Sequence, residues 1–136
     1  WELLFIDNCS SDRSKEIIHN IGDHRIRYFT TPRKITLGAA RKFGVDRAEA
    51  DWIGFLDTDD LWEPEKLEKQ LQHLKTGKYD MCYGGVREIT EQGQLIRDYF
   101  PKKETANISS QLRQYDINLV TPLISKIFIK SHSLCS

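Results

Sequence analysis

The sequence lacks an excess of charge of either sign, and it lacks a long apolar run. Its 136 residues contain 20 basic and 20 acidic side chains, so no overall field favours nucleic acid or an anionic membrane surface. No apolar stretch approaches the roughly 20 residues that a transmembrane helix requires. We therefore expect no nucleic acid partner and no membrane span in this chain, and any ligand has to be held by a local site.

Cysteine is scarce, and a targeting segment is missing. Cys9, Cys82 and Cys135 lie far apart and lack the close spacing of zinc or redox motifs. This pattern predicts reduced thiols in a cytoplasmic protein, and it leaves open membrane association of a full-length form. The chain opens directly on the strand-like segment Trp1–Ile6, without a start methionine or signal peptide, which we interpret as truncation.

The most informative stretch is the apolar run Trp52–Leu56, which is followed at once by the acidic segment Asp57–Asp60. A short apolar run that contains aromatic residues is typical of a buried parallel strand. Ligands of open α/β sheets gather outside the carboxyl ends of strands, which is where these carboxylates would lie. Alternate strand residues point to opposite sides, so a turn beginning at Thr58 is needed to bring Asp57 and Asp59 together.

The remaining pattern alternates strands and helices and predicts one α/β domain over residues 1–136. The expected strands are Leu3–Ile6, which ends at Asp7, and Ile26–Phe29, with a hairpin formed by Asp80–Thr90 and Leu95–Phe100 and a last strand followed by some helix within Leu119–Ile129. The first expected helix runs from about Asp12 to Gly22, with Ile17, Ile18 and Ile21 on one face, and the second follows the stripe Leu37, Ala40, Gly44 and Ala48. The third runs from Pro64 to Gly77, with Leu67, Leu71 and Leu74 on one face. A short fourth helix is expected over Ile108–Tyr115.

Three carboxylates within the four residues Asp57–Asp60 repel one another, which raises their pKa values unless a cation lies between them. Magnesium and manganese prefer oxygen ligands and commonly combine one or two carboxylates with substrate phosphate oxygens. A simpler interpretation is that the acidic turn caps the helix that starts at Pro64, because carboxylates favour the positive end of a helix dipole. The acidic pattern alone does not decide between these two interpretations.

Three motifs in this order carry a resemblance to a known family: Ile6–Asp12, Thr31–Arg41 and Phe55–Trp62. In these motifs the chain resembles the family 2 glycosyltransferases of the GT-A fold. The resemblance runs from Trp1 to about Leu74 and is loose beyond that point. It implies a Rossmann-like α/β sheet with flanking helices that binds a nucleotide-diphosphate sugar.

The resemblance also implies an activity and roles for individual residues. Such an enzyme transfers sugar from the nucleotide-diphosphate donor to a hydroxyl of a carbohydrate or lipid-linked acceptor, with a divalent metal and with inversion, as in polysaccharide biosynthesis. Asp7 would accept hydrogen bonds from the base, and Arg41 would lie near the base or phosphates. In the Asp-x-Asp motif, Asp57 would bind ribose and Asp59 would hold Mn²⁺ or Mg²⁺. Asp60 could exchange roles with its neighbour.

The resemblance further indicates which family features this chain lacks. Family members begin with one more strand, which would lie between the Leu3–Ile6 and Trp52–Leu56 strands. We expect those two strands to pair directly, to leave an exposed groove, or to receive a strand from a partner such as a second copy of the chain. The catalytic base stays unknown, because Asp116 is the only aspartate after Asp98 and its surroundings do not match the family motif.

Alternative interpretations accompany each assignment. Asp7 could simply cap the following helix, Arg41 could be a surface residue, and Trp62 is more often a core anchor than a platform for sugar. The whole chain could be a nucleotide-binding or interaction module without catalysis. An Asp-nucleophile magnesium phosphohydrolase is disfavoured, because such enzymes usually place Gly and Thr after the second aspartate, where this chain has Asp60 and Leu61.

Overall fold

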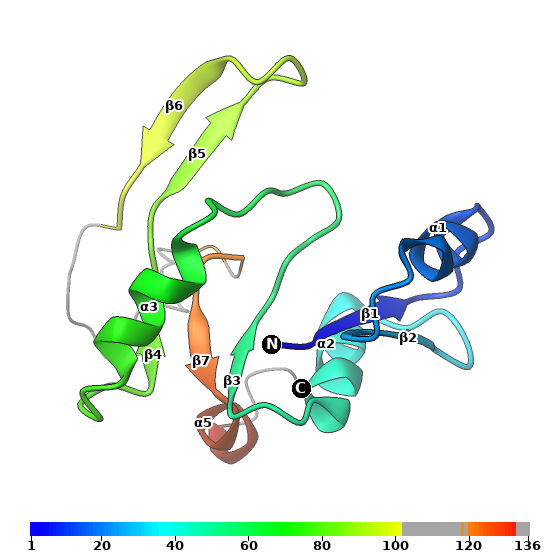
Figure 1. The fold of residues 1–136 in the computed structure, drawn as a ribbon, viewed down its shortest axis with the longest axis horizontal. Coiled ribbons are helices and arrows are strands. Elements are labelled where there is room, and N and C mark those ends of the chain that lie inside the picture. Colours follow the sequence, from blue (N-terminus) through cyan, green and yellow to red (C-terminus); the bar gives the residue numbers. More distant parts are fainter. Residues whose placement is uncertain (102–117, 119, 133–136) are drawn as a thin grey trace. The chain divides into compact units, whose positions relative to one another are not determined.

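The computed structural model describes residues 1–101, 118 and 120–132 (Figure 1). By their contacts, the residues divide into two compact units, Trp1–Ile53 with Ser125–Ser136 and Gly54–Ile124. The predicted single domain over residues 1–136 stays a prediction. The predicted helix Ile108–Tyr115 lies outside the described residues. None of the described helices is both long and apolar enough to cross a membrane.

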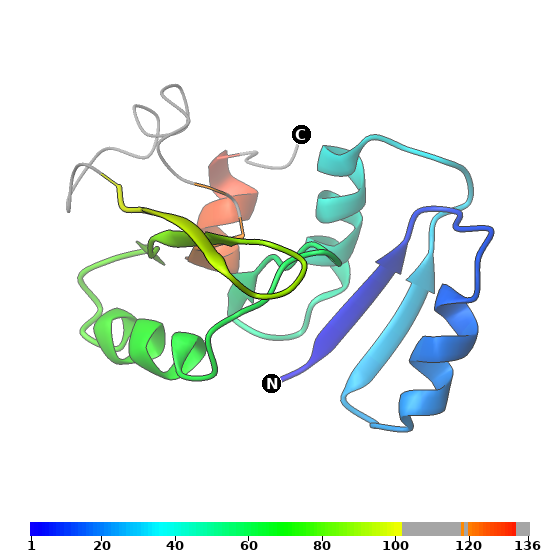
Figure 2. The ribbon, with the colours of Figure 1, turned by 90° about the horizontal axis from the view of Figure 1, so that it is seen from above.

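The first unit begins with the predicted strand–helix–strand arrangement. Strands β1 (Leu3–Asp7) and β2 (Ile26–Thr30) are parallel and pair along their whole length, with Asp7 opposite Thr30. Figure 2 shows the two strands side by side with helix α1 (Ser14–Ile21) beside them. The helix ends at Gly22, whose φ of +68° lies in the left-handed region that glycine adopts readily. Both predicted strands and the predicted helix stop are confirmed.

Helix α2 (Leu37–Arg47) packs against β1 through small residues, as predicted. A Cβ atom added at Gly44 would lie 3.2 Å from Cγ1 of Ile6, so glycine allows the helix to approach the strand closely. Ala40 is buried on the same predicted stripe. The first member of that stripe, Leu37, is instead 58% exposed. Ile6 contacts α2 at Gly44, whereas the Phe5 ring stacks on Tyr28, whose ring lies 5.4 Å from His19 of α1. Because neighbouring residues of a strand point to opposite faces, α2 and α1 lie on opposite faces of the two-stranded ribbon.

The predicted apolar face of α1 exists in the sequence, but most of it is not buried. Ile17 is 58% exposed and Ile21 is 54% exposed, and α1 contains no buried residue. Ile17 and Ile21 thus belong to the predicted apolar face, but the described residues do not bury them. The physical reason is that the ribbon beside α1 has only two strands in the described part of the chain, which is too narrow to cover a helix.

A three-stranded sheet has the order β3-β7-β4. Strand β3 (Trp52–Gly54) is shorter than the apolar run predicted, while β4 (Met81–Cys82) pairs antiparallel with β7 (Leu123–Ser125). Helix α5 (Lys126–His132) follows β7 directly, so the predicted strand with a helix after it is confirmed. Among the described strands, no sheet contains both β1 and β3, so direct pairing, the first of the three expected alternatives, does not occur there.

Helix α3 (Lys66–Leu74) anchors the second unit. Its buried Gln70 donates hydrogen bonds from Nε2 to the backbone oxygens of Cys82, at 3.0 Å, and Thr121, at 2.8 Å. Trp62 is half-buried and donates from Nε1 to the backbone oxygen of Val120 at 3.0 Å, and its interpretation as a core anchor stays a prediction. These bonds tie the helix and the segment before it to β4 (Met81–Cys82) and to the segment just before β7 (Leu123–Ser125).

The predicted hairpin is also part of the second unit. Strands β5 (Val86–Ile89) and β6 (Leu95–Tyr99) are antiparallel, with Val86 opposite Tyr99. Two cross-strand ion pairs, Arg87 with Asp98 at 3.0 Å and Arg97 with Glu88 at 2.5 Å, accompany this register. The hairpin is largely exposed, so these pairs contribute little to its stability.

The leucine face of α3 allows a direct test of how this helix packs in the second unit. Leu74 is only 2% exposed, and we expect Leu74→Ala to lower the free energy of unfolding by about 2–5 kcal/mol, because it removes buried methyl groups and leaves a cavity. Leu61 is 83% exposed, so Leu61→Ala is the matched control and should change stability by less than about 0.5 kcal/mol. Urea denaturation measures both, and equal effects of the two variants would contradict the packing described.

Candidate functional site

Asp7 ends strand β1 and is only 6% exposed. Its Oδ1 accepts a hydrogen bond from the backbone amide of Ser10 at 2.7 Å, and its Oδ2 accepts one from the hydroxyl of Tyr28. These bonds, first those from Ser10 and then the one from Tyr28, hold the pKa of Asp7 below its ordinary value despite burial. Asp7 is therefore an ionised side chain that can only accept hydrogen bonds.

Tyr28 reaches Asp7 from strand β2, where it lies opposite Phe5. The rings of Phe5 and Tyr28 stack with centroids 5.9 Å apart, and the His19 ring lies 5.4 Å from the Tyr28 ring. The hydrogen bond to Asp7 comes first among the causes that raise the pKa of Tyr28 to about 12. The hydroxyl therefore stays protonated at neutral pH and keeps its role as donor to Asp7.

Asn8 closes the loop that follows Asp7. Its Oδ1 accepts hydrogen bonds from the Ile35 amide at 2.9 Å and the Thr31 hydroxyl at 3.0 Å, and its Nδ2 donates to the Ile35 oxygen at 2.8 Å. Asn8 thus joins the end of β1 to the loop between β2 and α2. Neither Asn8 nor Tyr28 was assigned a role from the sequence. The position of Tyr28 beside Asp7 depends on the register between β1 and β2, and the bonds of Asn8 depend on the path of the loop after β2. No local sequence pattern gives either of these.

The predicted basic residues differ in exposure. Arg33 and Lys34 are exposed in the loop after β2, while Arg41 is half-buried on α2. Arg41 and Asp7 belong to the same unit, and α2 packs against β1. The structure thus brings these two predicted site residues onto neighbouring elements. Their roles toward a ligand stay predictions.

The acidic segment of the second unit forms the turn that the sequence requires. The amide of Asp60 donates to the backbone oxygen of Asp57 at 3.1 Å, with Thr58 and Asp59 in the turn. Asp60 is exposed as a residue, yet the part of its carboxyl group withdrawn from water raises its pKa, and the charges of Asp59 and Asp57 raise it further. The turn thus concentrates negative charge, as a site for a cation would.

Neither the acidic turn Asp57–Asp60 nor Asp7 caps a helix. The N-cap of α3 is Glu65, five residues beyond Asp60, and it has no side-chain capping bond. The N-cap of α1 is Arg13, whereas Asp7 bonds to Ser10. Helix capping therefore does not explain the acidic turn or Asp7, and α3 begins two residues after the predicted position at Pro64.

The acidic turn supplies only oxygen atoms, the donors that Mg²⁺ and Mn²⁺ prefer. Within the described residues, no group of three or more His, Cys, Asp or Glu side chains is arranged to hold a metal ion. Asp59 would thus hold a metal together with oxygens that the protein does not supply, such as phosphate and water. The chemistry of the residues present fits a divalent cation, with an incomplete set of protein ligands.

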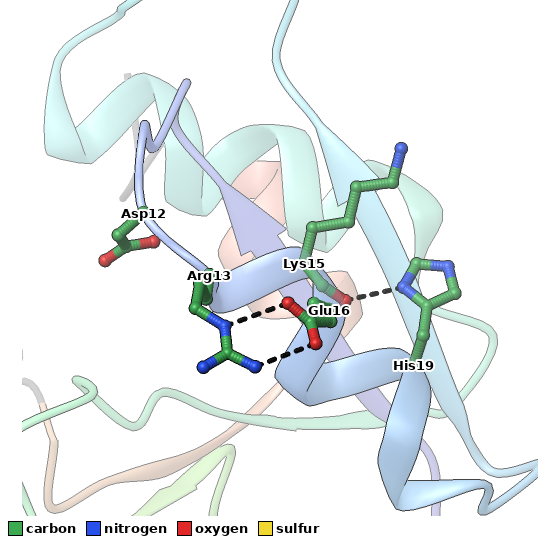
Figure 3. Close-up of a pocket in the computed structure, with 5 residues that line it drawn as sticks. All are labelled: Asp12, Arg13, Lys15, Glu16 and His19. Carbon is green, nitrogen blue, oxygen red and sulfur yellow. Dashed lines mark hydrogen bonds and ion pairs between the residues drawn. The ribbon is translucent and has the colours of Figure 1, made fainter.

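A separate hollow lies beside helix α1 in the first unit (Figure 3). Its volume is about 370 Å³, and it is open to solvent. Among its lining residues, Arg13 pairs with Glu16 at 2.8 Å, and His19 Nδ1 lies 2.7 Å from the Lys15 backbone oxygen. The lining consists of Asp12, Arg13, Lys15, Glu16 and His19. None of the predicted site residues contributes to this hollow.

Residues 1–130 match the sequence model of a family described as "Glycosyl transferase family 2". The chain belongs to glycosyl transferase family 2. Membership confirms the predicted family and the Rossmann-like α/β fold of the GT-A type. Its homologues are glycosyltransferases, so the chain is part of an enzyme family of sugar transfer.

Curated relatives of this glycosyltransferase chain come from several bacteria. An uncharacterised glycosyltransferase of Haemophilus influenzae is 34% identical over 95% of this chain and 52% of its own length. A putative teichuronic acid biosynthesis glycosyltransferase of Bacillus subtilis, TuaG, is 26% identical over 93% of this chain and 51% of its own length. The Escherichia coli UDP-Glc:alpha-D-GlcNAc-diphosphoundecaprenol beta-1,3-glucosyltransferase WfgD is 28% identical over 98% of this chain and 52% of its own length. The chain therefore spans about half the length of these relatives.

The contact between Tyr28 and Asp7 predicts a measurable change in titration. Tyr28→Phe removes one of the hydrogen bonds that stabilise the charged carboxylate, so the pKa of Asp7 should rise toward its ordinary value. The stability that ionised Asp7 contributes is complete above its unfolded-state pKa and is lost as pH falls through its folded-state pKa. In the variant this loss should therefore occur at higher pH.

Carboxyl-carbon NMR titration of Asp7 measures this shift directly. Tyr79→Phe is the matched control, because Tyr79 is 53% exposed and lies in the other unit. An Asp7 pKa that is the same in wild type and Tyr28→Phe would contradict the hydrogen bond.

Proposed function

We propose that the protein containing this chain transfers a sugar from a nucleotide-diphosphate donor to an acceptor hydroxyl, with a divalent metal and with inversion at the sugar. The observation that carries this proposal is the match to glycosyl transferase family 2 over residues 1–130. The chain supplies the donor-binding part. Its free thiols Cys9 and Cys82 are compatible with the cytoplasm, which we propose as its compartment.

The proposed substrates follow the names of the relatives. The name of WfgD gives UDP-glucose as donor and a sugar linked to diphosphoundecaprenol as acceptor, and that of TuaG gives teichuronic acid biosynthesis. These names support a nucleotide-diphosphate sugar donor and a carbohydrate or lipid-linked acceptor for this chain. They also support a role in assembling a polysaccharide.

We propose that Asp7 accepts a hydrogen bond from the base and that Arg41 lies near the base or phosphates. The low pKa of Asp7 supports the first role, because an ionised carboxylate accepts a hydrogen bond from a ring N–H. Asp57 would bind ribose, and Asp59 would hold Mn²⁺ or Mg²⁺, with Asp60 able to exchange with its neighbour. The turn between Asp57 and Asp60 supports this arrangement by gathering their carboxylates in one short segment.

The metal would act as a Lewis acid that stabilises charge on the departing nucleoside diphosphate. The contribution of the chain is to offer carboxylate oxygens at a fixed turn and to orient the base and ribose. A base for the acceptor hydroxyl is still unassigned. Asp98 is paired with Arg87 at 3.0 Å, which lowers its pKa, and Asp116 lies outside the described residues.

A second candidate function is nucleotide binding without transfer. The observation that favours it is the engagement of Asp98 in an ion pair, which leaves the described part of the chain without a late aspartate suited to deprotonate the acceptor. Release of sugar from the donor, or its transfer to an acceptor, would separate an enzyme from such a module.

Substitution of Asp59 tests the proposed metal site. We expect the chain to bind uridine, guanosine or thymidine diphosphate sugars more tightly with Mn²⁺ than without it, and Asp59→Ala to lower the metal-dependent affinity at least about tenfold, because a charged metal ligand is lost. Calorimetric titration with and without Mn²⁺ gives these affinities.

The matched control is Asp80→Ala, which removes an exposed carboxylate of the same unit and should leave the affinity within about twofold of wild type. Binding that does not depend on metal, or that survives Asp59→Ala unchanged, would remove the proposed role of Asp59.

A further inference from the structure

The Asp7 carboxylate is held in place by hydrogen bonds to both of its oxygens. Each of its oxygens accepts a hydrogen bond, one from the Ser10 amide at 2.7 Å and one from the Tyr28 hydroxyl. Asp7 is also 6% exposed, so its plane cannot turn freely. The Ser10 bond is local, whereas the Tyr28 bond reaches across 21 residues of sequence.

We propose that Tyr28 is a positioning residue of the nucleotide site, whose hydroxyl fixes Asp7 so that its carboxylate selects bases with a ring N–H. This inference rests on the proposed function, in which Asp7 receives the base. Tyr28 acts through Asp7 and makes no contact of its own with the ligand.

The surroundings of Tyr28 explain how it can hold another side chain in place. The ring is stacked on Phe5 at 5.9 Å and lies 5.4 Å from His19 of α1, so packing on both strand and helix restricts its rotation. The register of the parallel pair then directs its hydroxyl to Asp7, two residues beyond Phe5 on the same face of β1. A restricted donor orients its acceptor better than a mobile one.

The Tyr28 bond does not use up the accepting capacity of Asp7. An ionised carboxylate has about four lone-pair sites, and Ser10 and Tyr28 occupy one on each oxygen. A base can therefore donate to a site that remains. Because the two existing bonds fix the plane of the carboxylate, the directions of the remaining lone pairs are fixed as well.

Ionised Asp7 can only accept hydrogen bonds, so it distinguishes bases by whether the ring nitrogen at the pairing edge carries a hydrogen. Uracil, thymine and guanine present a ring N–H at the pairing edge, whereas cytosine and adenine present a lone pair there. A lone pair facing a carboxylate is left without a donor, which costs binding free energy. The site should therefore prefer diphosphates of uridine, thymidine or guanosine over those of cytidine.

The test is calorimetric titration of the complete chain with uridine diphosphate and cytidine diphosphate in the presence of Mn²⁺. Tyr28→Phe removes only the hydroxyl, and we expect it to weaken uridine diphosphate binding about tenfold, as loss of one hydrogen bond to a charged group predicts. Cytidine diphosphate binding should change less than about twofold, so the selectivity falls. Tyr79→Phe, at a 53% exposed tyrosine, should leave both affinities unchanged.

Two further variants separate positioning from general loosening of the fold. In an Asp7→Asn background, Tyr28→Phe should cause no additional loss, because the hydroxyl acts only through the carboxylate. Phe5→Leu weakens the ring packing without removing the hydroxyl, and it should lower thermal stability while keeping the ratio of the two affinities.

The outcomes distinguish this inference from the proposed function. Wild-type chain that binds none of the diphosphates of uridine, thymidine and guanosine overturns both. Wild-type binding that Tyr28→Phe leaves unchanged or tightens overturns the role of Tyr28 alone, and equal weakening of both nucleotides shows a purely structural role. A selective loss that disappears in the Asp7→Asn background supports the inference.

Discussion

Repulsion among the carboxylates of Asp57–Asp60 is the constraint on which the candidate site depends. The sequence places three negative side chains within four residues, and the backbone bond from Asp60 to Asp57 folds them into one turn. The raised pKa of Asp60 reflects partial burial and this repulsion. A segment that only capped a helix would not require such an arrangement, since α3 starts well beyond it. The metal that we propose for this turn would offset the repulsion among its carboxylates.

The sequence predicted those elements whose signals are local. Gly22 marked the end of α1, and it adopts the left-handed conformation expected of a helix stop. The hairpin of β5 and β6 followed from two extended runs around a turn. The requirement for a turn at Thr58 also came from local geometry and is met. The three motifs that carried the family resemblance are local in the same sense, and the family match over residues 1–130 confirms that resemblance.

Features that depend on distant contacts could not be predicted in this way. The hydrogen bond between Asp7 and Tyr28 depends on the register of β1 with β2, which no composition or periodicity encodes. The exposure of Ile17 and Ile21 depends on how many strands lie beside α1, a property of the sheet rather than of the helix. The shortness of β3 has the same origin, because a strand extends only as far as it has a neighbour to pair with. The role of a residue toward a ligand depends on contacts with the ligand, which local sequence patterns do not encode.

The central proposal is that Asp59 of the acidic turn holds a divalent metal that binds the diphosphate of a nucleotide-diphosphate sugar. The most direct measurement is an NMR titration of the chain with UDP-glucose, first with Mg²⁺ and then with paramagnetic Mn²⁺. The account predicts that the Asp59 signal shifts with the sugar nucleotide only when metal is present, and that Mn²⁺ broadens Asp59 more strongly than the exposed Asp80 of the same unit. An Asp59 signal that does not shift, or no selective broadening at the acidic turn, would contradict it.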